Sequence, residues 1–409
     1  MRPVPTLLRG SSRPLTDLYD VALLDLDGVV YIGANAVPGA PETLAVARRA
    51  GMRLAFVTNN AARTPEAVAE HLAALGVPAT AAEIVTSAQA AAHYLADRLP
   101  AHARVLVVGT TGLEQALRER GLVPVADALG HVDAVVQGFS PDLTWGLLAE
   151  GAVAINRGVP WVATNVDPTV PSPRGRLPGN GSLVAALRHA THAEPIVTGK
   201  PDPTMHRESV QRSGARRPIV VGDRLDTDVE GANAVGCDSL LVLSGVTSAA
   251  ELLTAPPVWR PTFLAADLGG LLVPHEQPAL VEGGAVCGRW RAARFGAGGG
   301  AGDGRGGGGA PGARDDDDDG DDARLTLRRH AGARPNEPAG EAASAADGLD
   351  ALRALCAARW GLTAAPRRGS SDAGGDARNV AAAVRVEPDG DDAESRRAAA
   401  DTLGRLGLA

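Results

Sequence analysis

The chain has 409 residues, too many for one ordinary domain, so two or three domains are expected. Hydrophobic residues make up 44% of it, enough to build a core, and its net charge of −8 argues against a general nucleic-acid binder. Three widely spaced cysteines match neither a disulfide framework nor a CxxC metal site, and no apolar run is long enough for a signal peptide or membrane span, so we expect a cytoplasmic protein without a membrane partner.

Strand and helix signals alternate along the first two-thirds of the chain. Short apolar runs predict strands at residues 21–26, 53–58, 104–108, 134–137, 161–164, 196–198, 218–221 and 239–243. Helical patterns lie between them, at residues 36–50, 64–75, 112–120, 144–157, 182–191, 203–213 and 226–235. Strands that are apolar throughout and separated by helices predict an α/β fold with a parallel sheet covered on both faces. In such sheets the active site lies outside the carboxyl ends of the strands.

The last third of the chain contains a Gly-rich and then Asp-rich stretch, residues 296–322. It cannot bury enough apolar surface to fold, which predicts a flexible segment. Foldable sequence surrounds it, with strands expected at residues 289–295, 324–328 and 381–386 and helices at 347–360 and 392–406. Residues 275–409 are therefore predicted to form a small α+β module of order ββαβα. Its polar residues form no constellation that we assign to chemistry.

A pair of aspartates ends the first predicted strand. Asp25 and Asp27 are two residues apart, so in an extended chain their side chains project to the same side. Two carboxylates this close repel each other unless a cation lies between them or one is protonated. A metal together with a nucleophile–acid pair meets both conditions, and Gly28 lets the chain turn sharply over the site. Taken alone, a β-turn with a helix-capping aspartate explains the same residues equally well.

Two more polar segments stand at the ends of predicted strands. Thr58, Asn59 and Asn60 offer a hydroxyl and backbone N–H groups that can hold phosphate oxygens, although a helix N-cap has the same composition. Lys200 is the only lysine among 40 basic residues and lies in a Gly-Lys-Pro turn. Its compact ammonium differs from the planar arginine fork, which indicates a site where a guanidinium does not fit. Such an ammonium can neutralise both a phosphate and a nucleophilic carboxylate.

More carboxylates follow the strand at residues 218–221. Asp223, Asp226 and Asp228 are hard oxygen ligands of the kind that suits Mg²⁺. A capped helix start also fits, because Asp226 and Thr227 are good caps. Four such segments in this order, each at a strand end, are much harder to explain as turns and caps alone. They predict a metal-assisted site for a phosphorylated substrate.

The segments DLDGVVYIG, VTNNAART, GKPDP and GDRLDTDVEGA resemble the four motifs of the haloacid dehalogenase superfamily of phosphatases. Together with TNVDPTVPSPRGRLPGNGSLVAAL, they are similar to its branch of bacterial nucleotide-type phosphatases, 4-nitrophenylphosphatases and phosphoglycolate or pyridoxal-phosphate phosphatases. The resemblance covers about residues 17–272. It implies a Rossmann-like core formed by residues 17–80 and 194–272, with an α/β cap domain inserted at residues 81–193.

The resemblance also implies roles for the motif residues. Asp25 would attack phosphorus and become an aspartyl-phosphate, and Asp27 would protonate the leaving alcohol and then activate water. The second and third motifs would hold the phosphoryl group through Thr58, Asn59 and Lys200. The first and fourth motifs would bind Mg²⁺ through Asp25, the backbone carbonyl of Asp27, Asp223 and, through water, Asp228.

The cap is expected to close over the site and exclude water, so its residues would set substrate choice. Candidate substrate contacts lie after the second motif and in the family-like cap segment: Asn60, Arg63, Asn165, Asp167 and Arg174. Asn165 and Asp167 serve equally well to order the loop around Pro168. Caps of this branch also mediate homodimers, which predicts a dimer by analogy.

The substrate expectation comes from the C-terminal module. Some members of the branch carry an extension that resembles part of an acetyltransferase fold and act on glycerol 3-phosphate. This favours glycerol 3-phosphate over 2-phosphoglycolate, with sugar phosphates, nucleotides and pyridoxal phosphate as further alternatives. The module shows no clear glycine signature of an acetyl-coenzyme A loop, so acetyl transfer is not predicted.

Two other classes of function fit the sequence less well than a phosphatase. Gly109-Thr-Thr-Gly112 follows a strand but matches the dinucleotide-binding GxGxxG pattern poorly, which argues against an oxidoreductase. A non-enzymatic binding protein would be expected to lack Asp25, Asp27 or Lys200, and all three are present. A phosphotransferase shares every motif and stays open, as does a regulatory role for the C-terminal module.

Overall fold

The structure, a computed structural model, describes residues 7–172, 175–294, 324–329, 341–363, 385–388 and 393–408. The predicted flexible segment, residues 296–322, and the candidate Arg174 lie outside these residues. The chain divides into two compact units. Unit 1 holds residues 13–246 and 265–274, and unit 2 holds residues 247–264, those from 275 onwards and a short N-terminal segment, residues 4–12.

The first sheet contains the strands that precede the first, second and fourth motifs, whereas the third motif follows β12 (Ile196–Val197) of the second sheet. The order of the first sheet is β15-β14-β13-β1-β4-β5, and β1 pairs in parallel with both β13 and β4. The strands are β1 (Val21–Leu24), β4 (Arg53–Thr58), β5 (Ile84–Thr86), β13 (Pro218–Gly222), β14 (Asp238–Val242) and β15 (Phe263–Ala265). All four residues of β1 are fully buried, as expected of a strand in a parallel sheet that is covered on both faces. The predicted parallel α/β core is confirmed.

Helices and short helical turns precede, connect or follow these strands. They are α1 (Leu15–Leu18), α2 (Ala40–Arg49), α3 (Pro65–Ala74), η1 (Ala81–Glu83), α8 (Pro203–Ser213), the π-helical turn η2 (Leu225–Val229), α9 (Glu230–Val235) and η4 (Leu268–Leu272). A small hairpin, β2 (Tyr31–Ile32) and β3 (Asn35–Ala36), begins within the first motif. Thr64 caps α3 through its hydroxyl, and Pro65 occupies the first helical turn, so the sequence itself marks where this helix begins.

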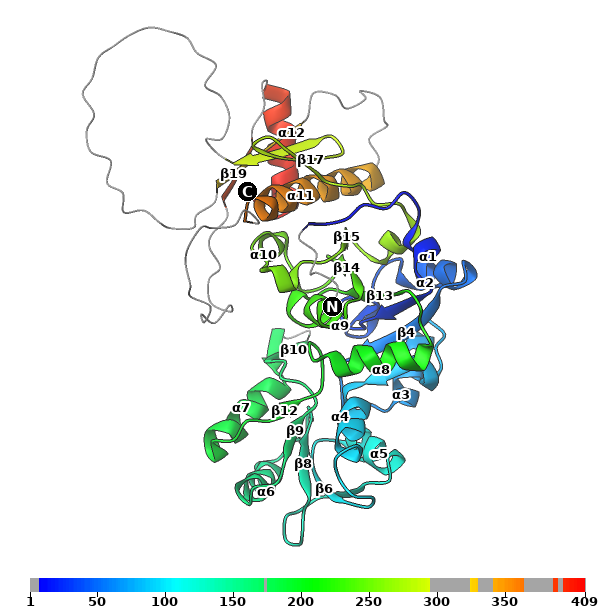
Figure 1. Cartoon of the computed structure of the whole chain (residues 1–409), viewed down its shortest axis with the longest axis vertical. Helices are drawn as coiled ribbons and strands as arrows, with labels where there is room; N and C mark the ends of the chain where they lie inside the picture. The colour runs from blue at the N-terminus through cyan, green and yellow to red at the C-terminus, as the bar shows by residue number, and fades with distance from the viewer. Residues whose placement is uncertain are drawn as a thin grey trace, which may run out of the picture. The chain divides into compact units, whose positions relative to one another are not determined.

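A second, all-parallel sheet has the order β12-β9-β8-β6-β7. Its strands are β6 (Arg104–Val108), β7 (Val123–Val125), β8 (Ala134–Gln137), β9 (Trp161–Ala163) and β12 (Ile196–Val197). Figure 1 shows α6 and α7 on one side of this sheet and α4 and α5 on the other. These helices are α4 (Ser87–Ala96), α5 (Thr111–Glu119), α6 (Trp145–Asn156) and α7 (Asn180–Thr191), and a hairpin of β10 (Thr169–Ser172) and β11 (Gly175–Pro178) precedes α7.

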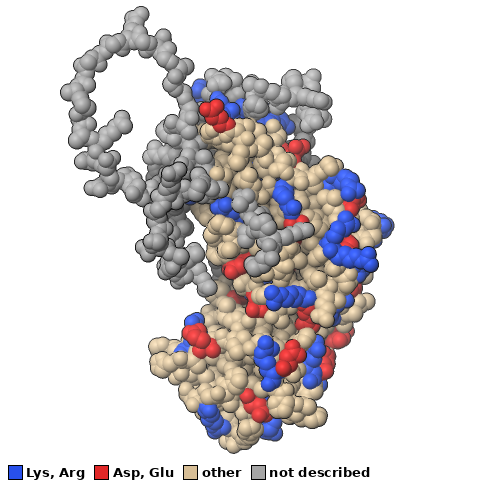
Figure 2. Space-filling view, viewed as in Figure 1, with Lys and Arg blue, Asp and Glu red and all other residues tan. Residues whose placement is uncertain are grey.

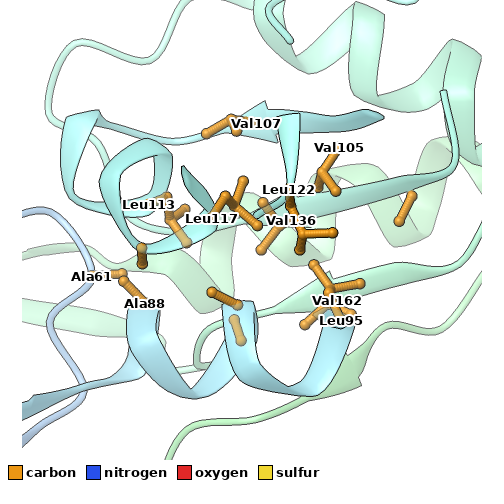
Figure 3. Close-up of a cluster of buried hydrophobic side chains, with 14 of the residues drawn as sticks. Ala61, Ala88, Leu95, Val105, Val107, Leu113, Leu117, Leu122, Val136 and Val162 are labelled. Atoms are coloured by element: carbon orange, nitrogen blue, oxygen red, sulfur yellow. The ribbon is translucent and has the colours of Figure 1, made fainter. Parts of the chain in front are cut away.

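One hydrophobic cluster joins the second sheet to the second motif. Leu113 and Leu117 of α5 point into it together with Val136 and Val162 of the sheet (Figure 3). Ala61, which follows Asn60 in the second motif, is fully buried in the same cluster. The loop that carries the second motif is therefore anchored on both sheets of unit 1.

Strand pairing moves the expected boundaries of the inserted domain. Residues 84–86, predicted as cap, form β5 and pair with β4 in the first sheet. Residues 196–197, predicted as core, form β12 and pair with β9 in the second sheet. Both strands are very short. The sheet that each one joins therefore depends on which sheet edge is nearby in space, and not on the residue pattern of the strand itself.

Unit 2 contains a five-stranded sheet of order β16-β17-β18-β19-β20. The strands are β16 (Ala279–Val281), β17 (Gly284–Cys287), β18 (Trp290–Arg294), β19 (Arg324–Arg329) and β20 (Arg385–Pro388), with helices α10 (Ala249–Leu253), α11 (Glu341–Thr363) and α12 (Ala393–Arg405) and the turn η3 (Pro257–Trp259). The predicted order ββαβα omits β16 and β17. They form a short glycine-bounded hairpin, which has too few residues for a clear alternating pattern.

Helix α11 is buried along much of its length. Every residue from 351 to 360 is buried, including two arginines. The guanidinium of Arg353 contacts Asp350 at 2.7 Å, the carbonyl of Leu264 at 2.6 Å and the His275 ring at 3.3 Å. These partners compensate the cost of burying its charge.

One face of the described residues carries side chains of both charge signs. On the face shown in Figure 2, acidic and basic side chains are interspersed. Such mixing keeps the local field small. Among the helices that the structure describes, none combines the length and the apolar character needed to cross a membrane.

Replacing Phe56 with alanine is expected to lower the free energy of unfolding by about 3–5 kcal/mol, because the ring fills the interior of β4 and would leave a cavity. Phe56 is fully buried, whereas Ile32 is 52% exposed. The Ile32→Ala variant should therefore change this free energy by only about 0.5 kcal/mol. Urea unfolding followed by circular dichroism measures both, and equal losses would contradict the assignment of Phe56 to the core.

Candidate active site

The four motifs meet at one edge of the first sheet. Asp25 follows β1, and its backbone N–H donates to the carbonyl of Val221 in β13 at 2.8 Å, which continues the parallel ladder. Gly28 then reverses the chain with a φ of 84°, in the left-handed region that favours glycine. A Cβ at Gly28 would lie 2.5 Å from a carboxylate oxygen of Asp223, so a side chain there would collide with the fourth motif.

Lys200 joins three of the motifs through its ammonium. The Nζ atom lies 2.7 Å from Asp25 Oδ1 and 2.7 Å from Asp228 Oδ1, and it donates to the carbonyl of Val57 at 3.1 Å. Lys200 is only 3% exposed, so the ammonium is removed from water and satisfied by these three oxygens. A point charge with three donors suits this arrangement, and the wide fork of arginine does not.

The charges at this edge shift each other's protonation. Burial lowers the pKa of Lys200, but the carboxylates of Asp228 and Asp25 outweigh burial and hold that pKa above its ordinary value. Burial raises the pKa of Asp25 well above its ordinary value, and the Lys200 ammonium opposes that rise. Burial and the neighbouring Asp228 carboxylate raise the pKa of Asp223 to about 7. An additional cation at this edge would favour the ionised carboxylates.

Three carboxylates form a cluster that fits a hard divalent cation. One oxygen each from Asp25, Asp223 and Asp228 lies within 4.8 Å of the other two. Asp223 is fully buried, and its Oδ2 accepts from the backbone N–H of Val246 at 2.6 Å. Its Oδ1 is buried and has no hydrogen-bond partner within the described ranges. Buried polar atoms are almost always paired, so this oxygen indicates a place for a ligand, and Mg²⁺ prefers such donors.

Asp27 lies outside this cluster and has a different environment. Asp27 is an exposed residue, whereas Asp25 is only 9% exposed. The surrounding protein desolvates the Asp27 carboxyl and raises its pKa, although the positive charges of Lys200 and Arg63 oppose this. An accessible carboxyl with a raised pKa can hold a proton and exchange it with a small molecule.

The second motif is held in a tight turn after β4. The hydroxyl oxygen of Thr58 accepts from the backbone N–H of Asn60 at 3.1 Å, and Asn60 Oδ1 accepts from the N–H of Ala62 at 2.7 Å. The side chain of Asn59 turns the other way and contacts Lys200 and Asp167. Only the backbone of Asn59 therefore remains as a candidate for phosphate binding, rather than its amide.

The candidates from the inserted domain lie at different depths. Asn165 is buried, donates to the carbonyl of Asn59 at 2.8 Å and accepts from the N–H of Asp167 at 3.2 Å. Its amide is thus used within the loop that contacts the second motif. Asp167 is half-buried. Arg63, which follows the second motif outside the inserted domain, is exposed. The structure brings Asn165 and Asp167 to Asn59.

Residues after β14 complete the site without an obvious motif. Ser244 donates to the carbonyl of Gly28 at 2.7 Å, and Val246 donates its N–H to Asp223. Their only signal in the sequence is their position after an apolar strand.

Arg224 stands in the fourth motif, and its guanidinium pairs with Asp226 at 2.8 Å. Asp226, named with the fourth-motif carboxylates, therefore faces an arginine and lies outside the cluster of three carboxylates.

Known proteins share this arrangement. Residues 22–123 match the family model of haloacid dehalogenase-like hydrolases, and residues 197–271 match a second, HAD-hydrolase-like model. The chain is 51% identical over 263 residues to D-glycerol 3-phosphate phosphatase of Mycobacterium tuberculosis, covering 64% of this chain and 73% of that protein. It is 35% identical over 261 residues to acid sugar phosphatase of Staphylococcus aureus, covering 63% of this chain and 99% of that protein.

Solved structures extend the likeness to nearly the whole chain. Crystal structures of glycerol phosphate phosphatase from Mycobacterium tuberculosis, in complex with calcium and with magnesium, superpose with TM-scores of 0.73 and 0.71 at 39% and 38% identity. Both cover 97% of this chain and 99% of that protein, so the likeness reaches beyond the four motifs. On this evidence, the chain belongs to the haloacid dehalogenase-like hydrolases.

Proposed function

We propose that this protein is a Mg²⁺-dependent phosphatase that hydrolyses glycerol 3-phosphate through an aspartyl-phosphate on Asp25. The observation that carries the proposal is the buried Lys200 ammonium, 2.7 Å from both Asp25 and Asp228, beside the unpaired oxygen of Asp223. A nucleophilic carboxylate, an ammonium and a place for a hard cation converge there. Phosphoryl transfer needs these three elements, because most of its barrier is electrostatic repulsion between anions.

Each residue has a chemical task in this proposal. Asp25 attacks phosphorus, and Asp27 gives its proton to the leaving alcohol oxygen. Asp27 then takes a proton from the water that hydrolyses the acyl phosphate, so one carboxyl serves both halves of the reaction. Thr58, the backbone N–H of Asn59 and Lys200 hold the phosphoryl oxygens.

The metal ligands proposed are Asp25, the backbone carbonyl of Asp27, Asp223 and, more remotely, Asp228. When bound, Mg²⁺ supplies positive charge that lowers the repulsion between the carboxylate and the phosphate dianion. Asp228 already contacts Lys200, so in this proposal it also holds the ammonium beside the nucleophile.

Glycerol 3-phosphate is favoured by the closeness of the mycobacterial enzyme, whose name states that substrate. The staphylococcal relative is named an acid sugar phosphatase, which supports a sugar phosphate as the second candidate. Substrate contacts are proposed for Asn60, Arg63, Asn165, Asp167 and Arg174. 2-Phosphoglycolate, other small phosphate monoesters and transfer to an acceptor other than water remain alternatives to be tested.

The assembly and location of the protein are further proposals. We infer a core domain and an inserted cap, supported by the two separate parallel sheets of unit 1. A homodimer formed through the cap and a cytoplasmic location remain predictions. Deleting residues 275–409 would test the C-terminal module, since retained activity with a lost effector response supports regulation and insolubility supports a structural role.

Phosphate release from glycerol 3-phosphate is expected with Mg²⁺ and should fall at least about 100-fold with excess chelator, because the metal neutralises the attacking carboxylate. The measurement compares glycerol 3-phosphate, 2-phosphoglycolate, a hexose phosphate, pyridoxal phosphate, a nucleoside monophosphate and 4-nitrophenyl phosphate. The highest kcat/KM is expected for glycerol 3-phosphate. A higher value for another ester would replace the proposed substrate, and full activity in chelator would remove the metal from the proposal.

A further inference from the structure

The side-chain amide of Asn59 uses both of its N–H donors, and its oxygen as an acceptor, inside the protein. Its Oδ1 accepts from the backbone N–H of Lys200 at 2.8 Å. Its Nδ2 donates to the backbone carbonyl of Lys200 at 3.2 Å and to Asp167 Oδ2 at 3.1 Å. Both N–H bonds of the amide are therefore used, and the amide cannot also donate to a phosphate.

The backbone of Asn59 is fixed as firmly as its side chain. Its carbonyl accepts from the hydroxyl of Ser87 at 2.6 Å and from Nδ2 of Asn165 at 2.8 Å. These donors come from the start of α4 and from the loop after β9. Asn59 is thus held from two sides, so its side-chain amide can fix the position of the Lys200 backbone that it contacts.

The position of the Lys200 ammonium depends on a backbone that is held in place. Its side chain has four rotatable bonds, yet Nζ must stand 2.7 Å from both Asp25 and Asp228. Two hydrogen bonds, one to the N–H and one to the carbonyl of a single residue, fix both the position and the orientation of its Cα. The neighbouring Gly199 permits this approach, because a Cβ there would lie 2.8 Å from Asn59 Oδ1 and 2.1 Å from the carbonyl of Thr164.

We propose that Asn59 is a positioning residue for Lys200 and that Asp167, from the loop after β9, fixes the orientation of the Asn59 amide. The inference rests on the proposed phosphatase function, in which Lys200 contacts the transferring phosphoryl group. It assigns the Asn59 side chain to the ammonium rather than to the substrate. It also ties the placement of that ammonium to Asp167, in the loop after β9 of the second sheet.

Asn59→Ala is expected to lower kcat/KM for glycerol 3-phosphate by about 100-fold, because a displacement of about 1 Å at a catalytic group costs that much. The inhibition constant of orthovanadate, which mimics the phosphoryl group in its transition state, should rise in the same proportion. A merely structural role would lower the fraction of active protein and leave this inhibition constant unchanged. Asn156→Ala, at an exposed asparagine that ends α6, is the matched control and should change neither value.

Asp167 provides a second, independent test. Asp167→Ala removes the acceptor and should lower kcat/KM by about 10-fold, whereas Asp167→Asn keeps an acceptor oxygen and should retain several times the activity of Asp167→Ala. The double variant Asn59→Ala/Asp167→Ala should be no worse than Asn59→Ala, because both act through one amide. Additive losses, or equal losses in the two Asp167 variants, would overturn the role of Asp167. If a thermal melt shows that Asn59→Ala does not fold, the comparison of Asp167→Ala with Asp167→Asn still tests the proposal.

The two proposals fail in different ways. A wild-type protein without Mg²⁺-dependent phosphate release would overturn the proposed function. An active wild type, together with a folded Asn59→Ala variant whose kcat/KM and vanadate inhibition are unchanged, would overturn only the positioning role.

Discussion

Asp25→Asn is expected to lower phosphate release at least roughly 10⁴-fold, a loss typical of removing a covalent nucleophile. The amide occupies the same volume but has no anionic oxygen to attack phosphorus, so no acyl phosphate can form. The fold should persist, because the change also removes one of three crowded carboxylates. Stopped-time phosphate assays measure the loss, and mass spectrometry of acid-quenched wild type measures the covalent intermediate.

Asp127→Asn is the matched control for this variant. Asp127 is exposed in a loop of the inserted domain, where its Oδ1 accepts from the backbone N–H of Leu129, and an asparagine oxygen can do the same. The activity of the Asp127→Asn variant should equal that of the wild type. Phosphate release that survives Asp25→Asn would show that the nucleophile lies elsewhere, and the proposed mechanism would be wrong.

Lys200→Met is expected to lower kcat roughly 10³-fold and to destabilise the protein by about 3–5 kcal/mol in the presence of chelator. The methionine side chain fills most of the space of the lysine stem but leaves Asp25 and Asp228 buried without their shared ammonium. Removing one partner of a buried ion pair costs more than the pair contributes, because the remaining charges lose their compensation. Activity assays and urea unfolding report the two effects separately.

Lys200→Arg separates charge from geometry. It keeps the positive charge, but the planar fork cannot place one nitrogen between two carboxylates and a carbonyl in a site that is 97% buried. We expect a loss of activity close to that of Lys200→Met, with a smaller loss of stability. Arg49→Lys, at an exposed position at the end of α2, is the matched control and should change neither the activity nor the free energy of unfolding. A fully active Lys200→Arg protein would show that charge alone is required there.

The chain alone determines which residues can carry the chemistry. Asp25, Asp27 and Asp223 follow the short apolar strands β1 and β13, and parallel pairing brings the carboxyl ends of these strands to one edge. That rule needs only local patterns and the order of strands. The structure places Asp25 and Asp223 together, as this argument predicts, and leaves the Asp27 carboxylate outside the cluster of three carboxylates. Lys200 reaches the same edge from β12 of the second sheet, which the argument does not predict.

Only the tertiary structure decides how those residues are supported. Asn59 and Lys200 are 141 residues apart, and no pattern in either segment indicates that the amide of one holds the backbone of the other. The same is true of Val246, whose N–H orients Asp223, and of strands β5 and β12, which join the sheets opposite to those expected. Backbone hydrogen bonds and edge pairings depend on which segments approach in space, and every residue offers the same N–H and carbonyl groups, so side-chain identity cannot predict them.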